Sequence, residues 1–380
     1  MDPIAHTLAG ATLAQTRLKE LTPLATATLI LGANIPDIDV IVSVLGDDAS
    51  LLHRRGHTHG VLAMILLPLI LTALMLAYDR LWRRRRDPQK VPVDPRATLG
   101  LAYLGTLSHP ALDWLNTYGV RLLMPFDGRW FYGDTLFIID PWMWLLMGAT
   151  IVLTYSQRRL AIGAWIALGA AMSAIITFAS MVPTPASVAW WVGLLAIIAM
   201  RASGYTPEKR RLAAASCLAA FCTYLGLMGL GNTLASSRVT EHLAGQGVDA
   251  EVVMTGPTAA NPFAREVLAR SNTHYHALKL SLWPGASSIS SISSRYAPVP
   301  IEAPDPIAEA ALNAPSQRGF ANWVRFPVFE VQSHDEGHTV FIRDLRYVEP
   351  DATTSRGIGM RIVELDLQLN ERPDTASASH

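Results

Sequence analysis

Long apolar runs separated by clusters of basic residues fill the chain before about residue 232. The clearest run, Val61–Tyr78, is uninterrupted and is followed by the basic cluster Arg83–Arg86, so it predicts a transmembrane helix. Four further runs have the same character: Trp142–Tyr155, Leu160–Val182, Ser187–Met200 and Leu212–Leu230. The pattern therefore predicts an α-helical polytopic membrane domain, to which we assign residues 1–234.

Three shorter apolar segments lie in the same region. Ile4–Gln15 and Pro23–Ala33 fall below the roughly 20 residues that cross a bilayer core, so we expect helices that pack within the protein or enter the membrane only in part. Ala97–Leu107 predicts a helix that leads to His109. The next residue, Pro110, either kinks that helix or begins another.

The pattern changes from about Ser236 onward, where apolar and polar residues alternate with the period of half-buried strands. The alternating stretches are Tyr275–Trp283, Trp323–Gln332, Thr339–Tyr347 and Met360–Leu369. They predict a small, mainly-β extramembrane domain over residues 235–380. We expect its tail to be disordered from about residue 372.

Basic loops fall on one side of the membrane when the apolar segments are threaded alternately. The positive-inside rule makes that side cytoplasmic, which predicts that the β domain lies outside the cytoplasm. Candidate metal ligands and one further aspartate collect on the other side: His6, Asp37, His59, His109 and Asp140. We therefore expect a single site near the outer membrane surface.

Composition supports a membrane protein. Of the 380 residues, 50% are hydrophobic and only 16% are charged, and the mean hydropathy is +0.25, which is too apolar for an ordinary soluble enzyme. The formal net charge is zero, so no nucleic-acid partner is expected. Cys217 and Cys222 lie in one apolar run and predict no disulfide framework. The first 15 residues lack a basic segment and a long apolar core, so we expect no cleavable signal.

Candidate metal ligands recur at helix ends and in the expected loop Asn34–Gly60. His109 and Asp113 are four residues apart and share a face of a helix, while Asp37 and Asp39 are two apart and point to one side in a turn or strand. Imidazole and carboxylate together suit Zn²⁺, Mn²⁺ or Fe. We expect a divalent metal, zinc first, and enough ligands for more than one ion. Paired metals would suit phosphoester hydrolysis.

The run HRRGHTHG adds three histidines and two arginines to this loop. His57 and His59 are two apart beside glycines that allow close approach to an ion, and His53 precedes them. Arg54 and Arg55 are placed to clamp a phosphate bidentately. Ordinary alternatives stay open, namely lipid-headgroup anchors for the arginines and a solvated loop residue for His57.

These segments resemble the YdjM-type family of bacterial inner-membrane proteins, which are described as membrane-bound metal-dependent hydrolases. The resembling motifs are HTLAG at His6–Gly10, IPDID at Ile35–Asp39, RRGHTHGVL at Arg54–Leu62 and LSHPALDWLNTYGVRLLMP at Leu107–Pro125. The family is similar, more remotely, to zinc-dependent phospholipase C and P1-type nucleases. That likeness suggests a phosphoester or lipid-like substrate.

The resemblance implies metal roles for His6, Asp37, His59, His109 and Asp113, with Asp39 as a further ligand or base. Where family members tend to show HRGxTHS, this chain has Arg54 and Gly60 at the first His and the Ser. The role of that His therefore passes to His53 or His57.

We therefore expect a membrane-bound, metal-dependent hydrolase that acts at the outer face by metal-activated water. Its expected partners are the lipid bilayer and a small-molecule or lipid substrate. The expected metal ligands are His6, Asp37, Asp39, His53, His59, His109 and Asp113, and the expected catalytic groups are Asp39, His57 and Arg55. The alternative is a non-enzymatic membrane protein with a structural metal site and a partner-binding β domain.

Overall fold

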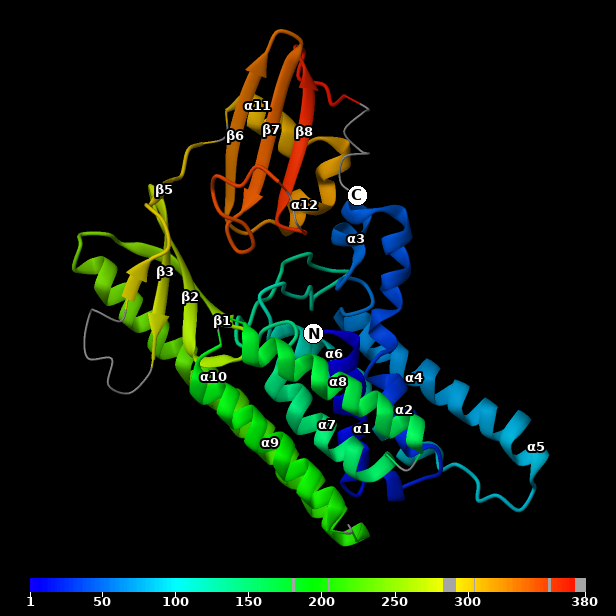
Figure 1. The fold of residues 1–380 in the computed structure, drawn as a ribbon. Helices are drawn as coiled ribbons and strands as arrows, with labels where there is room; N and C mark the ends of the chain where they lie inside the picture. The colour runs from blue at the N-terminus through cyan, green and yellow to red at the C-terminus, as the bar shows by residue number, and fades with distance from the viewer. Residues whose placement is uncertain are drawn as a thin grey trace. The chain divides into compact units, whose positions relative to one another are not determined.

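In the computed structural model the described residues are 1–156, 158–179, 182–203, 206–282, 292–303, 305–354 and 357–372 (Figure 1). The expected tail beyond residue 372 lies outside them. Packing divides the chain into two units, which we describe separately. The first unit comprises Met1–Ile38, Arg55–Thr233 and Gly256–Arg265, and the second comprises Asp39–Arg54, Leu234–Thr255 and Glu266–His380.

The helices of the first unit begin where the sequence offers good caps. Asp2, Asp94 and Asp140 each accept a hydrogen bond from a first-turn backbone N–H, and each is followed by a proline at the first helical position. The helices are α1 Pro3–Gln15, η1 Leu18–Glu20, α2 Ala25–Gly32, α4 Val61–Tyr78, η3 Asp79–Arg83, α5 Arg84–Arg86, α6 Pro95–Trp114, α7 Pro141–Tyr155, α8 Arg159–Phe178, α9 Thr184–Ala202 and most of α10 Pro207–Ala244.

Among the described residues, four helical segments are long and apolar enough to cross a membrane: Val61–Arg86, Arg159–Phe178, Thr184–Ala202 and Arg211–Ala244. At most 28% of each tested window is buried, so most of these apolar side chains face outward, as they would toward lipid. A fifth candidate joins α2 to the 3₁₀ helix η2 Ile35–Leu45 through a 41° bend. The predicted helical membrane domain is thereby confirmed.

The short helices form the interior of the first unit. Leu29 of α2 and Leu101 of α6 pack with Ala14 of α1, while Leu71 of α4 packs against Ala102 of α6. Pro110 lies inside α6, which continues to Trp114.

The described part of the C-terminal region forms two antiparallel sheets, which confirms the predicted mainly-β domain. The larger has the order β1-β2-β3-β4, with β5 also paired to β3, and the smaller has the order β6-β7-β8. Figure 1 shows β6, β7 and β8 side by side. The strands are β1 Ala250–Thr258, β2 Asn261–Ser271, β3 His274–Ser281, β4 Ile292–Ser294, β5 Val299–Pro300, β6 Pro327–His334, β7 Gly337–Asp344 and β8 Met360–Asp366.

Apolar residues at alternate positions fix the register of the smaller sheet. Val331 pairs with Val340, which in turn pairs with Val363. Two helices of this region are α11 Pro306–Leu312 and, after the 3₁₀ turn η5 Pro315–Gln317, α12 Arg318–Trp323. The strand expected from Trp323 therefore begins only at Pro327, because Trp323 is the fully buried last residue of α12.

The expected loop Asn34–Gly60 is instead largely helical. It contains η2 and the helix α3 Asp47–His53, which are separated by Gly46 at φ +103°. That left-handed conformation suits glycine and ends η2. Asp48 of α3 accepts a hydrogen bond of 2.9 Å from the backbone N–H of Phe320 in α12, so this segment is anchored within the second unit.

Candidate metal centre

Four side chains meet inside the first unit. They are Asp37 from η2, His59 from the turn before α4, and His109 and Asp113 from α6. One donor atom from each residue lies within 4.8 Å of all the others. His59, His109 and Asp113 are fully buried, and only 13% of the Asp37 side chain is exposed. The group is therefore shielded, with Asp37 at its accessible edge.

The two imidazoles face each other across this group. Their Nε2 atoms lie 3.1 Å apart, while Nδ1 of His109 lies 2.6 Å from the carbonyl oxygen of Ala33. Because a carbonyl only accepts, Nδ1 of His109 donates and its Nε2 presents a lone pair to the group. Nδ1 of His59 lies 3.0 Å from the hydroxyl of Thr58. An imidazole held by its outer nitrogen is the usual arrangement of a metal-ligating histidine.

The carboxylates complete the group from two sides. Oδ2 of Asp113 lies 3.3 Å from Nε2 of His59 and 3.6 Å from Nε2 of His109. Oδ1 of Asp37 lies 3.8 Å and 3.6 Å from the same two atoms. Two imidazoles and two carboxylates are donors that Zn²⁺, Mn²⁺ and Fe accept. The donor set therefore fits a divalent metal.

Two glycines let α2 and α6 approach closely enough for the Ala33 carbonyl to reach His109. A Cβ atom added at Gly105 would lie 2.9 Å from the carbonyl oxygen of Leu29, and one added at Gly32 would lie 3.2 Å from the Cα atom of Gly105. Larger residues would separate the helices. The contact explains why both positions are glycine.

His6 lies beside the group without belonging to it. Its ring stacks on His109, with the ring centroids 3.7 Å apart, and its Nε2 lies 3.2 Å from Oδ1 of Asp113. The amino group of Met1 also contacts Asp113. These contacts orient His109 and Asp113.

Arg55 is buried against the same carboxylate. Its Nε lies 3.1 Å from Oδ2 of Asp113, and one of its terminal nitrogens donates to Oδ1 of Asn116 at 3.0 Å and to the carbonyl of Gly119 at 3.2 Å. The guanidinium also lies 4.5 Å from the ring centroid of Tyr118. This pairing favours a role in positioning Asp113 over the phosphate clamp expected from the sequence.

The structure does not bring the remaining predicted residues into this group. Asp39 and Arg54 belong to the second unit, where the Arg54 Nε lies 3.8 Å from Oδ1 of Asp39. Residues two apart in a 3₁₀ helix lie on different faces, which explains why Asp39 does not accompany Asp37. His53 and His57 are exposed.

Sequence reasoning missed several partners of the centre, among them the Ala33 carbonyl, the Thr58 hydroxyl and Asn116. Asn116 stands three residues after Asp113 in the same motif, and this spacing was a usable signal. A backbone carbonyl carries no side-chain signature, so the role of Ala33 emerges only from the packing of α2 on α6.

A shielded group of histidines and aspartates, in a unit whose longer helices suit a bilayer, defines an integral membrane protein with a candidate metal centre. Residues 1–184 match the family model described as YdjM inner membrane protein, so the resemblance is confirmed over that part of the chain.

The chain is also similar to the "Uncharacterized protein YfhP" of Bacillus subtilis (strain 168), with 23% identity over 129 residues. The match covers 33% of this chain and 35% of that protein, so it spans about a third of the relative's length. No solved structure matches the chain.

Proposed function

We propose that this protein is a metal-dependent hydrolase of the bacterial inner membrane that acts on a phosphoester or lipid-like substrate. The observation that carries the proposal is the buried group of two histidines and two aspartates with donor atoms within 4.8 Å of one another. The YdjM family match supports the inner membrane as its location.

In this proposal Asp37, His59, His109 and Asp113 hold the ion. When bound, such an ion lowers the pKa of water and neutralises charge on a phosphoryl oxygen. The Ala33 carbonyl fixes the His109 imidazole, as its 2.6 Å contact with Nδ1 requires. Water and substrate reach the group past Asp37, its one partly exposed member.

Arg55 keeps Asp113 ionised and oriented in this proposal. A buried carboxylate needs a partner of opposite charge, and the guanidinium at 3.1 Å supplies it. The expectation of a second ion stays a prediction, since four donors suffice for one.

We also propose that the centre and the β domain lie on the periplasmic side. The basic clusters Arg83–Arg86 and Arg158/Arg159 support this orientation through the positive-inside rule. Alkaline phosphatase fused after residue 380 should be active, because it matures only in the periplasm. A fluorescent reporter that folds only in the cytoplasm should be dark at the same position, and the reverse pair of results would contradict the orientation.

Hydrolysis is tested on detergent-purified protein stripped with a chelator and reloaded with Zn²⁺ or Mn²⁺. We expect reloading to restore cleavage of bis(p-nitrophenyl) phosphate or of a phospholipid, and Asp113→Asn to lower the rate by at least about 100-fold. The control Asp335→Asn, at an exposed position in the β6–β7 turn, should keep the wild-type rate. Protein that binds metal but cleaves none of these substrates would favour a structural metal site with a partner-binding β domain.

A further inference from the structure

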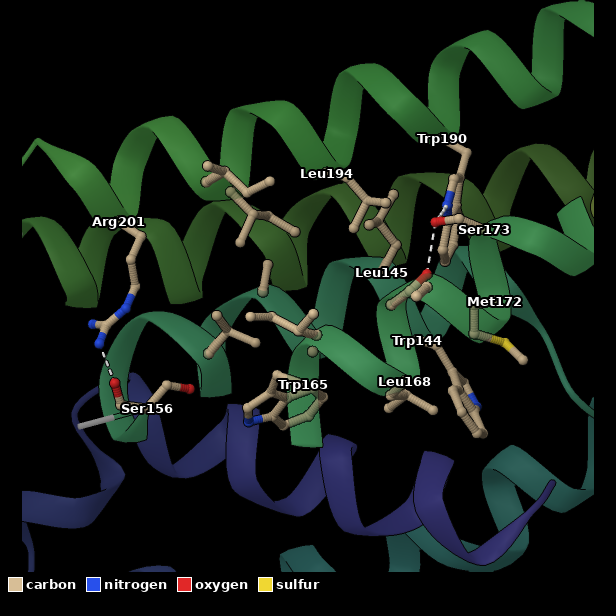
Figure 2. A pocket seen from close by; sticks show the side chains of 18 of the residues that line it. Trp144, Leu145, Ser156, Trp165, Leu168, Met172, Ser173, Trp190, Leu194 and Arg201 are labelled. Atoms are coloured by element: carbon tan, nitrogen blue, oxygen red, sulfur yellow. Dashed lines mark hydrogen bonds between the residues drawn. The ribbon is translucent and has the colours of Figure 1, made fainter. Parts of the chain in front are cut away.

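A cavity of about 570 Å³ lies among α7, α8 and α9 of the first unit (Figure 2). Its volume falls within the range of ligand pockets. Its walls are mostly apolar and include Trp144, Leu145, Trp165, Leu168, Met172 and Leu194. Since α8 and α9 are candidate membrane spans, a lipid of the bilayer is the ligand class that this position favours.

The cavity is polar at one end. Arg201, in the last turn of α9, donates a hydrogen bond to the carbonyl of Ser156, which follows α7 (Figure 2). The Ser156 residue is only 1% exposed, and its hydroxyl has no hydrogen-bond partner among the described residues. A buried hydroxyl without a partner is costly, so a ligand that hydrogen-bonds here would be stabilised.

At the opposite end, no comparable group is found among the described residues. There the indole of Trp190 donates to the hydroxyl of Ser173 at 2.9 Å, so both polar atoms are satisfied within the protein (Figure 2). The cavity is therefore shaped for a molecule with one long apolar part and one anionic, hydrogen-bonding head.

We propose that this cavity binds one anionic phospholipid, with an acyl chain between α7, α8 and α9 and the phosphate at Arg201 and Ser156. A guanidinium presents five donors and binds phosphate preferentially, and the apolar surroundings strengthen the charge interaction. This site is separate from the metal centre and does not depend on the proposed hydrolysis.

Headgroup selection is tested by native mass spectrometry of delipidated protein titrated with dioleoyl phosphatidylglycerol or dioleoyl phosphatidylcholine. Wild type should bind one phosphatidylglycerol about tenfold more tightly than phosphatidylcholine. Arg201→Gln should bring that ratio close to one. Arg159→Gln removes the same charge from a residue outside the cavity wall and should keep the preference.

Binding of the acyl chain is tested by a substitution that fills the cavity. A Cβ atom at Gly169, which lines it, meets nothing within 4 Å, so Gly169→Phe should place its ring in the cavity and abolish lipid binding. Gly163 is equally open on the same helix but does not line the cavity, so Gly163→Phe should bind lipid like wild type.

Equal binding of the two lipids by wild type would overturn the proposal, as would undiminished binding by a folded Gly169→Phe variant. If Gly169→Phe does not fold, the comparison of Arg201→Gln with Arg159→Gln decides alone. If Arg201→Gln alone loses the preference for phosphatidylglycerol, the site is supported. If both variants lose the preference equally, the proposal is overturned.

Discussion

The Nε2 atoms of His59 and His109 lie 3.1 Å apart in the interior of the first unit. Two neutral imidazoles that both point a lone pair inward repel each other unless a proton or a cation lies between them. The outer nitrogen of His109 donates to the Ala33 carbonyl, which directs its lone pair inward. With Asp37 and Asp113 beside them, the pair is arranged for a cation.

Metal content should therefore depend on this pair and its carboxylates. We expect purified wild type to carry at least one equivalent of zinc or manganese by inductively coupled plasma mass spectrometry, and His109→Ala and Asp113→Ala to lose it. The exposed His334 of β6 provides a matched control, since His334→Ala removes an imidazole from the second unit. Wild type that stays metal-free after reconstitution would contradict the centre and the proposed hydrolysis together.

The close approach of α2 to α6 should affect metal affinity, although the glycines that permit it are not ligands. Gly105→Ala places a methyl group 2.9 Å from the Leu29 carbonyl, so α2 must shift and weaken the bond between Ala33 and His109. We expect zinc affinity to fall about tenfold in competition with a chromophoric chelator. Gly100→Ala, on the same helix with nothing within 4 Å of the new Cβ, should leave affinity unchanged and stabilise the protein by about 0.5–1 kcal/mol. Equal affinities for both variants would argue against helix approach as the cause.

Arg55 should matter for stability as much as for the centre. Arg55→Lys keeps the charge but loses the planar set of donors that serves Asp113, Asn116 and Gly119. Leaving the buried acceptors of Asn116 and Gly119 without their donor should lower the free energy of unfolding by about 1–3 kcal/mol, measured by chemical denaturation in detergent. Arg54→Lys changes a side chain that is 30% exposed and should cost no more than about 1 kcal/mol. Similar losses in both variants would contradict the positioning role.

The sequence predicted the fold class because its two periodicities are plain. Val61–Tyr78 is a continuous apolar run of membrane-spanning length, and the structure has α4 there. Thr339–Tyr347 alternates as a half-buried strand does, and it overlaps β7. The expectation of a loop at Asn34–Gly60 was wrong. Two aspartates interrupt the apolar residues of η2, and α3 has only seven residues, so neither segment is long enough to show a regular helical pattern. Spacing alone did not reveal the anchoring of Asp48 to Phe320.

The candidate centre was predictable where the ligands share a helix. His109 and Asp113 meet because four residues make about one helical turn. In each of the two pairs spaced by two residues, only one member belongs to the group. Asp37 and Asp39 lie in a 3₁₀ helix, where residues two apart lie on different faces. His57 and His59 differ in burial, and only His59 belongs to the group.

The segment Asp344–Tyr347 (sequence DLRY) of the second unit should have a structural role. Asp344 is fully buried and accepts hydrogen bonds from the backbone N–H of Arg325 at 2.9 Å and from the Arg346 guanidinium at 2.7 Å. Asp344→Asn leaves the buried Arg346 charge without its carboxylate, and we expect a loss of about 3–5 kcal/mol. Limited proteolysis should then cleave within β6–β8, whereas the exposed control Asp335→Asn should resist like wild type. Equal resistance of both variants would show that the pair is dispensable.

Asp140, which caps α7, should make stability depend on pH. Burial raises the pKa of its carboxyl to about 6, even though the carboxylate accepts hydrogen bonds from the Met143 N–H at 2.9 Å and the Tyr224 hydroxyl at 2.9 Å. The folded protein therefore prefers the protonated form. The protonated Asp140 carboxyl contributes fully to folding stability below about pH 4, the ordinary pKa of the group. That contribution is lost as the pH rises through 6.

The difference between these two pKa values corresponds to about 3 kcal/mol. Asp140→Asn keeps the cap and the neutral shape but removes the titration. We expect the melting temperature of wild type in detergent to fall relative to Asp140→Asn as pH rises from 4 to 7, and the difference to stay constant above pH 7. Because every other titrating group is common to both proteins, subtracting the two profiles isolates this carboxyl. A constant difference between the two melting temperatures from pH 4 to 8 would contradict this prediction. It would mean that Asp140 ionises in the folded protein as readily as in water.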